Sequence, residues 1–488
     1  MLDQSFSSTN FNIIFLKENR KGNFKKEHFN QEYIDKHEEF KNVLEEKNDQ
    51  KVLLGYLDEE QLDSFAARLE KINEEKEIIR LNIFQLLCDK ICSSKFQFNI
   101  IYNPHNKVFS VEKDAPSYYA IKQLQYNINR TFKVAQANRN QIIKQLYNIV
   151  ADGYPKVIIK TDIKSFYETI PHEKLFHTIN DNNLLSPFSK KLIKKLFFEY
   201  ENKKDTAIIE SRKGVPRGIG LSAYLSELYM RDIDSSIKAM DDLVYYARYV
   251  DDIIAIFTPK TESSKGDYLG DIRRIICTEN NLSLKDGTDG EENKTLEINL
   301  MDKNTFNETF NFLGYSFSLV RTSKKKFSSL IEMSENKIER YKTRLTQSVE
   351  AYNIDSIYNE REARKLLFSR LKFLTGNFHL NNNKRNVKSG IYYSNEMLIL
   401  NDLKFTSLKR VDNELFSAIQ LLNPPPKIGI NKEKLIEHIQ QNFSFEDGFF
   451  MKEKHFYSFN FSKKETGFYF RKFKRATTKF EVIKTIWI

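Results

Sequence analysis

The run YYARYVDDIIAIF at positions 245–257 constrains the fold more than any other part of this sequence. Its two halves are rich in tyrosine and β-branched residues, as buried strands are, and two adjacent aspartates separate them. Aspartate is common in turns, so the simplest interpretation is a β-hairpin with Asp251 and Asp252 at its tip. A second interpretation is that the tip needs paired negative charge. The rest of the chain has to decide between the two.

The size and composition of the chain set limits on its architecture. At 488 residues it is too long for one ordinary domain, and 40% hydrophobic residues are enough for two or three cores. Lysine and arginine number 77 against 66 aspartates and glutamates, and the net charge of +11 permits a polyanionic partner without proving one. Only 16 glycines and 10 prolines favour long regular elements.

Three cysteines, Cys88, Cys92 and Cys277, are too few for a disulfide framework. Cys88 and Cys92 lie four positions apart in an apolar helical pattern with no histidine nearby, so we expect core thiols rather than a zinc site. The N-terminus has no signal-like apolar region, and no segment approaches the length of a membrane span. We therefore expect a soluble, cytoplasmic protein without a membrane partner.

The periodicity of apolar residues changes twice along the chain. Residues 1–110 have mostly helical patterns, clearest at 57–91, where apolar residues recur three and four positions apart. From about 155, short β-rich runs alternate with helices, and this order predicts a ferredoxin-like α+β core. Helical patterns return near 330, where Ser334 can cap a helix, and residues 455–484 interleave aromatic rings with lysine and arginine.

Four stretches of the central region carry groups with chemical potential, and each also has an ordinary structural explanation. Asp162 ends an apolar strand, where an aspartate more often caps the next turn. GVPRGIG at 214–220 is a turn before a helix, which is weak evidence by itself. Lys294 precedes a strand, as many solvated lysines do. Gly314 lies between aromatic residues in FNFLGYSF, where a glycine most often marks a strand kink.

The order and spacing of these pieces are more specific than any one of them. A strand ending in Asp162, a Gly-Pro-basic-Gly turn that opens a helix, and a Tyr-x-Asp-Asp hairpin fall within 91 positions, 162 to 252. A Lys-Thr pair and an FLGY strand follow. This arrangement resembles the palm of a reverse transcriptase. In that resemblance motifs A to E correspond to Asp162, GVPRGIGLS (214–222), YVDD (249–252), NKT (293–295) and FLGY (312–315).

The resemblance implies an α+β right-hand polymerase, with fingers, a ferredoxin-like palm and a mainly helical thumb or C-terminal region. It is strong over about 155–320 and looser on both sides. We expect four regions in chain order: an N-terminal helical region with the fingers at 1–154, the palm at 155–325, a helical thumb or C-terminal domain at 326–422, and a basic aromatic segment at 423–488.

Nucleotidyl transfer in polymerases of this kind uses two divalent ions, one at the attacking 3′ hydroxyl and one at the triphosphate. Mg²⁺ prefers hard oxygen ligands, and the resemblance makes Asp162 and Asp251 the principal ones, with Asp252 a weaker third. The Ile163 backbone carbonyl is a further expected ligand. The expected cofactor is two Mg²⁺ ions, with Mn²⁺ as the alternative. Lys294 would neutralise or protonate the pyrophosphate leaving group.

The resemblance also assigns residues to the incoming nucleotide and the primer. Tyr167, five positions after Asp162, falls where these polymerases place the steric gate, so its ring would clash with a ribose 2′ hydroxyl and favour dNTPs over rNTPs. The further nucleotide-binding candidates are Phe166, Arg217, Gly218 and, from the fingers, Arg139 and Lys133. The primer-grip candidates are Leu313, Gly314 and Tyr315.

Motif B departs from the usual pattern of the family. Arg217 stands where most members have glutamine, and Ser222-Ala223 replaces Ser-Pro, so a cation is added beside the nucleotide pocket. The chain shows no endonuclease, RNase H or integrase pattern. Its DIKSFY motif A (162–167), its GVPRG motif B (214–218) and its helical C-terminal extension are similar to those of the bacterial unknown-group and abortive-infection enzymes, the defence-associated reverse transcriptases. Among these enzymes the chain resembles the smaller polymerase of the type 3 system. That resemblance implies antiphage defence, a structured non-coding RNA, a DNA product, and a second polymerase subunit or further copies of the chain as partners.

Two other functions stay open from the sequence. The same site could make DNA without a template or from a protein tyrosine, and 24 tyrosines leave the acceptor unspecified. A degenerate polymerase fold that only holds RNA is the alternative of another class. The three aspartates argue against it, because paired carboxylates repel phosphates unless a metal is present. The basic aromatic tail fits single-strand binding and a β-rich subdomain equally well.

Overall fold

The computed structural model describes residues 3–111, 113–134, 137–204, 210–287, 292–301, 305–323, 326–380, 387–401, 406–425, 431–459, 464–465 and 477–487. The chain forms two compact units and passes between them more than once. Unit 1 combines residues 1–137 and 158–297, and unit 2 combines residues 138–157 and 298–488. These units do not test the four polymerase regions expected above, which stay a prediction.

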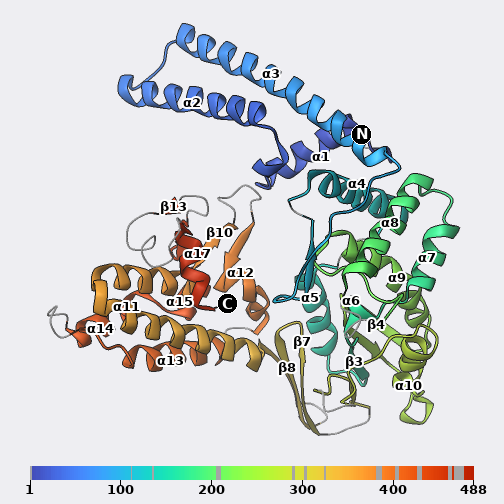
Figure 1. The fold of residues 1–488 in the computed structure, drawn as a ribbon. Coiled ribbons are helices and arrows are strands. Elements are labelled where there is room, and N and C mark those ends of the chain that lie inside the picture. Colours follow the sequence, from blue (N-terminus) through green and yellow to red (C-terminus); the bar gives the residue numbers. More distant parts are fainter. Residues whose placement is uncertain are drawn as a thin grey trace. The chain divides into compact units, whose positions relative to one another are not determined.

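Unit 1 opens with helices. Its elements before residue 137 are α1 (Ser8–Arg20), η1 (Lys26–His28), α2 (Gln31–Leu54), α3 (Glu59–Cys92), β1 (Ile101–Asn103), β2 (Val108–Ser110) and α4 (Ala115–Phe132). Helices α2 and α3 lie side by side (Figure 1). Asp58 and Gln61 form a capping box that starts α3. The helical pattern over 57–91 is confirmed, and it belongs to one continuous helix instead of a surface helix followed by a more buried one.

The rest of unit 1 is built around a four-stranded sheet. Its elements are β3 (Val157–Asp162), α6 (Phe166–Thr169), α7 (His172–Asp181), α8 (Pro187–Lys203), α9 (Leu221–Lys238), β4 (Leu243–Tyr249), β5 (Asp252–Phe257), η2 (Glu262–Ser264), α10 (Tyr268–Arg273), η3 (Arg274–Thr278) and β6 (Leu296–Asn299). The strand order is β4-β5-β3-β6. Every residue of β3 is buried, as its continuous apolar run predicts for an inner strand.

The hairpin expected at 245–257 is confirmed. Strands β4 and β5 pair antiparallel from Leu243 opposite Phe257 to Tyr249 opposite Asp252. Helix α9, expected after the Gly-rich turn, contacts β4 and buries Leu221, Leu225 and Leu228 along one face. The mixture of helices with this sheet agrees with the α+β prediction, while a ferredoxin-like palm stays an expectation.

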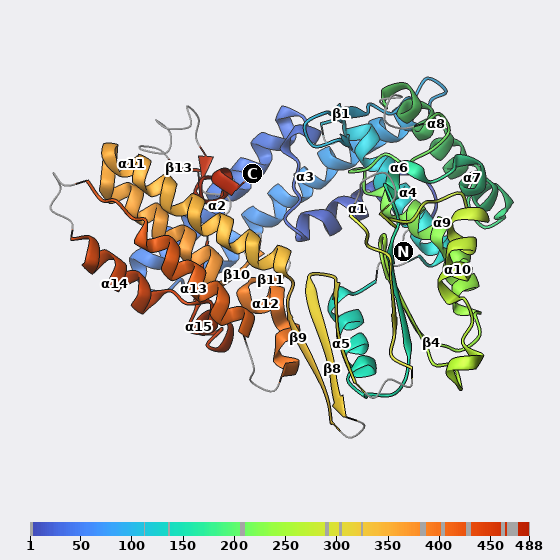
Figure 2. The same cartoon turned by 90° about the horizontal axis from the view of Figure 1, so that it is seen from below.

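Unit 2 combines a three-stranded sheet with a largely helical remainder. Its elements are α5 (Arg139–Val150), β7 (Phe306–Phe312), β8 (Tyr315–Ser323), β9 (Lys326–Met333), α11 (Glu335–Thr375), β10 (Asn377–His379), β11 (Lys388–Gly390), α12 (Ile391–Asn395), η6 (Glu396–Asn401), α13 (Thr406–Gln420), α14 (Lys432–Asn442), α15 (Phe445–Phe450), β12 (Phe456–Tyr457), β13 (Lys464–Glu465), β14 (Thr477–Thr478), α17 (Lys479–Lys484) and η8 (Thr485–Trp487). Figure 2 shows β8 beside β9, which pair antiparallel.

The long helix of unit 2 begins where the sequence places it. Helix α11 follows Ser334 and buries Ile338, Leu345 and Val349, while Tyr341 on the same face is half-buried. The Ser334 side chain makes no capping hydrogen bond, however, and Asn359 has non-helical backbone angles that divide the helix. Helices α11 and α13 pack against each other, which explains why the buried face extends over so many turns.

The FLGY segment is a hairpin turn, so the expected strand kink at Gly314 is wrong. Leu313 and Gly314 both have positive φ, 47° and 76°, and Phe312 pairs with Tyr315 across the turn. Two residues with positive φ are typical of the turns that match the twist of antiparallel strands, and they favour glycine. The segment therefore joins β7 to β8 instead of forming one strand.

Arg139 holds this turn. Its Nε donates to the Leu313 carbonyl at 3.0 Å, a second guanidinium nitrogen donates to the same oxygen, and the guanidinium carbon lies 5.1 Å from the centroid of the Tyr315 ring. The N-terminal residue of α5 is thus bound to the β7–β8 turn within unit 2.

The structure bears on the expectations about the cysteines and about membrane-spanning helices. Cys88 is half-buried and Cys92 is exposed, so the prediction that both are core thiols is wrong for Cys92, because the second position falls on the solvent side of α3. None of the helices in the described part of the chain has the length and apolarity of a bilayer span. Half of the basic aromatic stretch at 455–484, namely residues 460–463 and 466–476, lies outside the described residues.

Replacing Arg139 with methionine should loosen the β7–β8 turn. The Leu313 carbonyl would lose its charged donors, which stabilise by about 1.5–3 kcal/mol. Hydrogen–deuterium exchange should therefore speed up over residues 306–323, together with a lower thermal midpoint. Arg361→Met, at an exposed position of α11, is the matched control and should change neither measurement. Equal exchange in the two variants would contradict this role.

Candidate active site

Backbone hydrogen bonds join three segments at the end of β3. The Ile163 N–H donates to the Asp251 carbonyl at 3.1 Å, which ties the hairpin tip to the residue after Asp162. The Asp162 carbonyl accepts from the Lys285 N–H at 2.8 Å. Asp162 itself is 3% exposed. The strand end, the hairpin tip and the 285 segment thus meet at one place.

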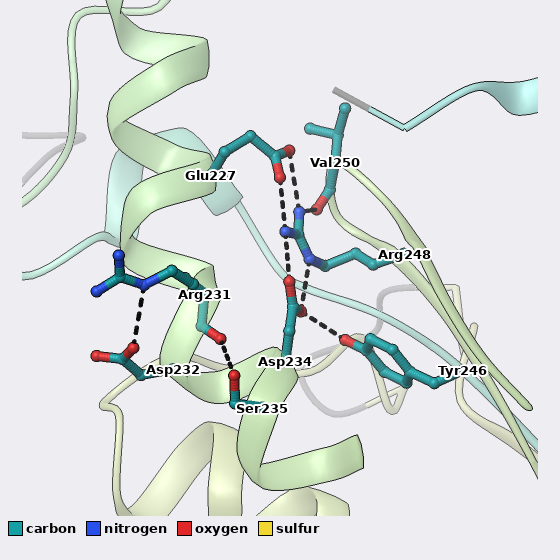
Figure 3. A network of polar contacts seen from close by, with 8 residues as sticks. All are labelled: Glu227, Arg231, Asp232, Asp234, Ser235, Tyr246, Arg248 and Val250. Carbon is teal, nitrogen blue, oxygen red and sulfur yellow. Dashed lines mark hydrogen bonds and ion pairs between the residues drawn. The ribbon is translucent and has the colours of Figure 1, made fainter. Parts of the chain in front are cut away.

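The hairpin tip rests on a buried arginine (Figure 3). Arg248 donates to the Glu227 carboxylate at 2.7 and 3.1 Å and to the Asp234 carboxylate at 2.8 Å from two nitrogens. Its Nη1 also donates to the Val250 carbonyl at 3.0 Å, and the Tyr246 hydroxyl donates to Asp234 at 2.7 Å. Glu227 and Asp234 lie seven positions apart on α9, so two turns of that helix face the strand.

This network fixes a strained turn. Val250 has a φ of 60°, which is unfavourable for a β-branched residue by about 1–3 kcal/mol. Burial acts to lower the pKa of Arg248, but hydrogen bonds and charge from Asp234 and Glu227 raise it overall, so the guanidinium stays charged. The hydrogen bond to the Val250 carbonyl holds the turn that presents Asp251 and Asp252. Sequence reasoning missed Arg248, although a charged residue within an apolar strand, with two carboxylates on the preceding helix, was a usable signal.

The three aspartates are close enough to repel one another. Burial, followed by the charge of Asp162, raises the pKa of Asp251. Burial and the charges of Asp162 and Asp251 raise the pKa of Asp252 to about 6. These shifts mean that the carboxylates share one poorly solvated space. The structure therefore brings together the three residues that the sequence proposed as one acidic cluster.

Two lysines meet the carboxylate of Asp162. Lys294 Nζ lies 3.5 Å from Oδ2, and Lys285 forms a shorter ion pair with Oδ1. Burial acts to lower the pKa of Lys285, but the hydrogen bond and charge of Asp162 raise it overall. Lys294 is where the sequence placed a cation, whereas Lys285 was missed because its contact depends on a fold that joins positions 123 residues apart. Both ammonium groups can face an anion that approaches Asp162.

Tyr167 lies beside the same tip. Its carbonyl accepts from the Val215 N–H at 2.7 Å, which binds the segment after β3 to the Gly-rich turn. Burial, followed by the charges of Glu227 and Asp251, raises the pKa of the Tyr167 hydroxyl, so the ring is near both carboxylates. Phe166 is buried, with its ring centroid 5.5 Å from that of Tyr167. The expected steric-gate residue is therefore part of the cluster.

The Gly-rich turn is packed against strand β2. Gly218 has a φ of 97°, and a Cβ there would lie 2.6 Å from the Phe109 carbonyl oxygen. The Phe109 N–H donates to the Arg217 carbonyl at 2.7 Å. The side chain of Arg217 is exposed, and its nearest carboxylate is that of Glu168 at 3.9 Å. The close approach that requires glycine at 218 is made by β2.

Two groups of expected residues lie elsewhere. Lys133 follows α4 as an exposed residue with a φ of 52°. Arg139, Leu313, Gly314 and Tyr315 form the turn contact of unit 2. The structure thus gathers Arg139 with the primer-grip candidates, whereas the sequence grouped it with the nucleotide-binding residues.

A comparison with protein families agrees with this geometry. Residues 107–317 match the model of the family described as reverse transcriptase (RNA-dependent DNA polymerase), a range that includes all three aspartates. The chain contains a reverse transcriptase domain. Such a domain is that of an RNA-directed DNA polymerase. No curated protein matches the sequence.

Solved structures similar to this chain include telomerases from two Candida species. Apo telomerase from Candida tropicalis truncated from its C-terminal domain is 18% identical with a TM-score of 0.27, over 44% of this chain and 47% of that one. Telomerase from Candida albicans in complex with a TWJ fragment of telomeric RNA is 12% identical with a TM-score of 0.31, over 67% and 56%. The chain spans about half the length of these structures. Scores this low do not establish a shared overall architecture.

The donor set of the cluster suits a hard divalent ion. Among the described residues no three acidic, imidazole or thiol side chains form a ready metal site, and Lys285 and Lys294 meet Asp162 instead. The cluster nevertheless offers oxygen ligands alone, from three carboxylates whose mutual repulsion a cation would relieve. These residues therefore fit the ion that the family uses.

Replacing Arg248 with methionine should destabilise unit 1 by about 3–5 kcal/mol, because Glu227 and Asp234 would be left as unpaired buried carboxylates. Thermal unfolding and hydrogen–deuterium exchange over residues 245–257 measure this effect. A variant that also carries Glu227→Gln and Asp234→Asn removes the unpaired charges and should recover most of the stability.

DNA synthesis should stay low in that triple variant, because the Val250 carbonyl still lacks its donor and the aspartates lose their fixed position. Full recovery of synthesis together with stability would show that Arg248 acts on folding alone.

Proposed function

We propose that the protein is an RNA-directed DNA polymerase that adds dNTPs to a primer with two Mg²⁺ ions at Asp162, Asp251 and Asp252. The observation that carries the proposal is the convergence of the buried Asp162 with the half-buried Asp251 and Asp252 within the range that matches the reverse transcriptase model. The ions would supply activation of the 3′ hydroxyl and neutralisation of the triphosphate charge. The Ile163 carbonyl, which adjoins Asp162, is the further proposed ligand.

The side chains around the aspartates take complementary roles in this proposal. Lys294 and Lys285 hold positive charge at Asp162, where either ammonium can stabilise or protonate the pyrophosphate leaving group. Tyr167, near Asp251, excludes a ribose 2′ hydroxyl. Phe166, Arg217 and Gly218 surround the nucleotide, and Lys133 contributes a more distant cation.

The turn of the β7–β8 hairpin is the proposed primer grip. Leu313, Gly314 and Tyr315 form it, and Arg139 holds its backbone. We therefore assign Arg139 to the position of the primer grip instead of to the triphosphate. Two of its nitrogens donate to the Leu313 carbonyl, which fixes the guanidinium at this turn.

The biological setting is a further proposal. The resemblance of the DIKSFY and GVPRG motifs to defence-associated enzymes supports a role in bacterial antiphage defence, with a structured non-coding RNA as template or scaffold. A second polymerase subunit or another copy of the chain is the proposed protein partner, and the proposed location is the cytoplasm. Untemplated or protein-primed synthesis by the same site is the alternative, and an RNA scaffold is the alternative of another class.

Purified protein with its copurified nucleic acid should incorporate labelled dNTPs when Mg²⁺ is present. The Asp251→Asn/Asp252→Asn variant should reduce this incorporation by more than about 100-fold. The neutral amides would no longer bind the divalent ions, whose charge stabilises the transition state. Labelled product that persists in the double variant would rule out the assigned site.

Two treatments separate the alternatives within this assay. RNase before the reaction should abolish templated synthesis and leave untemplated synthesis intact. Protease should change the mobility of the product only if a tyrosine served as primer. A wild-type protein that binds RNA but yields no product on any template would favour the scaffold.

The steric gate has its own test. Tyr167→Ala should raise the use of rNTPs relative to dNTPs, because the space next to the 2′ carbon opens, whereas Tyr167→Phe keeps the ring and should preserve the preference. The ratio of kcat/KM for the two nucleotide classes measures the effect. An unchanged ratio in Tyr167→Ala would exclude this role.

A further inference from the structure

A lysine-rich groove lies in unit 1 and shares no lining residue with the candidate active site. It runs between α8 and the segment at 94–97 and encloses about 800 Å³. Five lysines line it, four of them on α8, and Glu199 is the acidic side chain among its described lining. The lysine cluster was not singled out by any motif of the sequence.

The lysines of α8 surround an exposed aromatic ring. At about 100° per residue, Lys190, Lys194, Phe198, Lys191 and Lys195 follow one another around an arc of roughly 140°, with Phe198 in the middle. The Phe198 side chain is 62% exposed. The opposite face of the helix is buried and apolar, so packing accounts for that face and leaves this one unexplained.

Only part of the positive charge is used within the protein. Lys195 Nζ donates to the carbonyls of Ser94 and Phe96 at 3.0 and 2.6 Å, and Lys190 Nζ donates to the Asn180 carbonyl at 2.6 Å. Lys191 and Lys194 are exposed. In the part of the chain that the structure describes, no carboxylate forms an ion pair with a lysine of this helix face.

This arrangement opposes the stability of the helix. Lysines four positions apart, such as Lys190 with Lys194 and Lys191 with Lys195, repel each other. An exposed phenyl ring between them gains nothing from packing. A polyanion with flat apolar groups would relieve the repulsion and cover the ring together. Protein interfaces are depleted in lysine, so a nucleic acid fits this surface better than an acidic protein does.

We propose that this groove is a second nucleic-acid site, which binds single-stranded RNA. Lys191 and Lys194 contact phosphates, and Phe198 stacks on a base, which must be unpaired to reach the ring. The choice of RNA rests on the proposed function, while the preference for a polyanion rests on the groove itself. Such a site would hold a template or scaffold RNA outside the catalytic cluster.

Anisotropy of a fluorescein-labelled oligouridylate of about 16 nucleotides tests the proposal on the full chain without dNTPs or divalent ions. Lys191→Ala/Lys194→Ala should weaken binding and lower the slope of log K against log salt by roughly 1.4, since two phosphate contacts are lost. Phe198→Leu should weaken binding by about fivefold or more at an unchanged salt slope. Lys41→Ala/Lys51→Ala, on the exposed face of α2, is the charge-matched control and should match the wild type.

Photocrosslinking locates the site directly. A 4-thiouridine version of the same oligonucleotide should crosslink to a peptide that contains residues 187–203, and Phe198→Leu should reduce that crosslink. Its absence, or binding by both variants equal to the control, would overturn the proposal. If polyglutamate competes as strongly as unlabelled RNA, the groove binds an acidic protein and the proposal of an RNA site is wrong.

An assay of DNA synthesis distinguishes a failure of the groove proposal from a failure of the proposed polymerase function. DNA synthesis on a short primer–template should be the same in the groove variants and the wild type, because neither set of residues belongs to the catalytic cluster. An inactive wild type that still crosslinks at 187–203 would overturn the proposed function and leave the groove. A fully active wild type that does not crosslink at 187–203 would overturn the groove proposal and leave the proposed function.

Discussion

The buried guanidinium of Arg248 makes the contacts on which the acidic cluster depends. It joins α9 to β4 through Glu227 and Asp234, and it donates to the carbonyl of the strained residue Val250. Because α9 starts directly after the Gly-rich turn, the same contacts fix that turn relative to the hairpin tip. The tip can therefore keep two aspartates in a conformation that its own sequence disfavours.

Charge balance is the second constraint on this site. Burial and the charge of Asp162 raise the pKa of Asp251 and of Asp252, and Lys285 and Lys294 offset part of the repulsion at Asp162. Lys160, buried on β3, has its pKa lowered by burial while the charge of Asp252 acts to raise it. An acidic cluster with its own lysines can exist without a divalent ion. In the proposed function, the same lysines would be able to contact phosphates once a metal takes the carboxylates.

Sequence reasoning succeeded where the signal is local and failed where it is tertiary. The apolar runs gave β3 and the 245–257 hairpin, and helical spacing gave α3, α9 and the start of α11. The contact between Lys285 and Asp162 needs a fold that no periodicity encodes. The turn at 313–314 could have been found, because the buried aromatics Phe310, Phe312, Tyr315 and Phe317 change their alternation between 312 and 315. A two-residue turn shifts the alternation of buried and exposed side chains by one position, whereas a kinked strand does not require such a shift.

Gly218 has a packing role in addition to the nucleotide-binding role that the resemblance implies. The resemblance places this glycine beside a nucleotide, but in the folded chain its missing side chain makes room for the Phe109 carbonyl. The adjacent hydrogen bond from Phe109 to Arg217 binds the β1–β2 hairpin to the same turn. The two segments therefore cannot shift independently without breaking this bond. Any ligand that displaces the turn must also move β2, so the short β1–β2 hairpin is mechanically coupled to the proposed nucleotide site although none of its residues carries a recognisable motif.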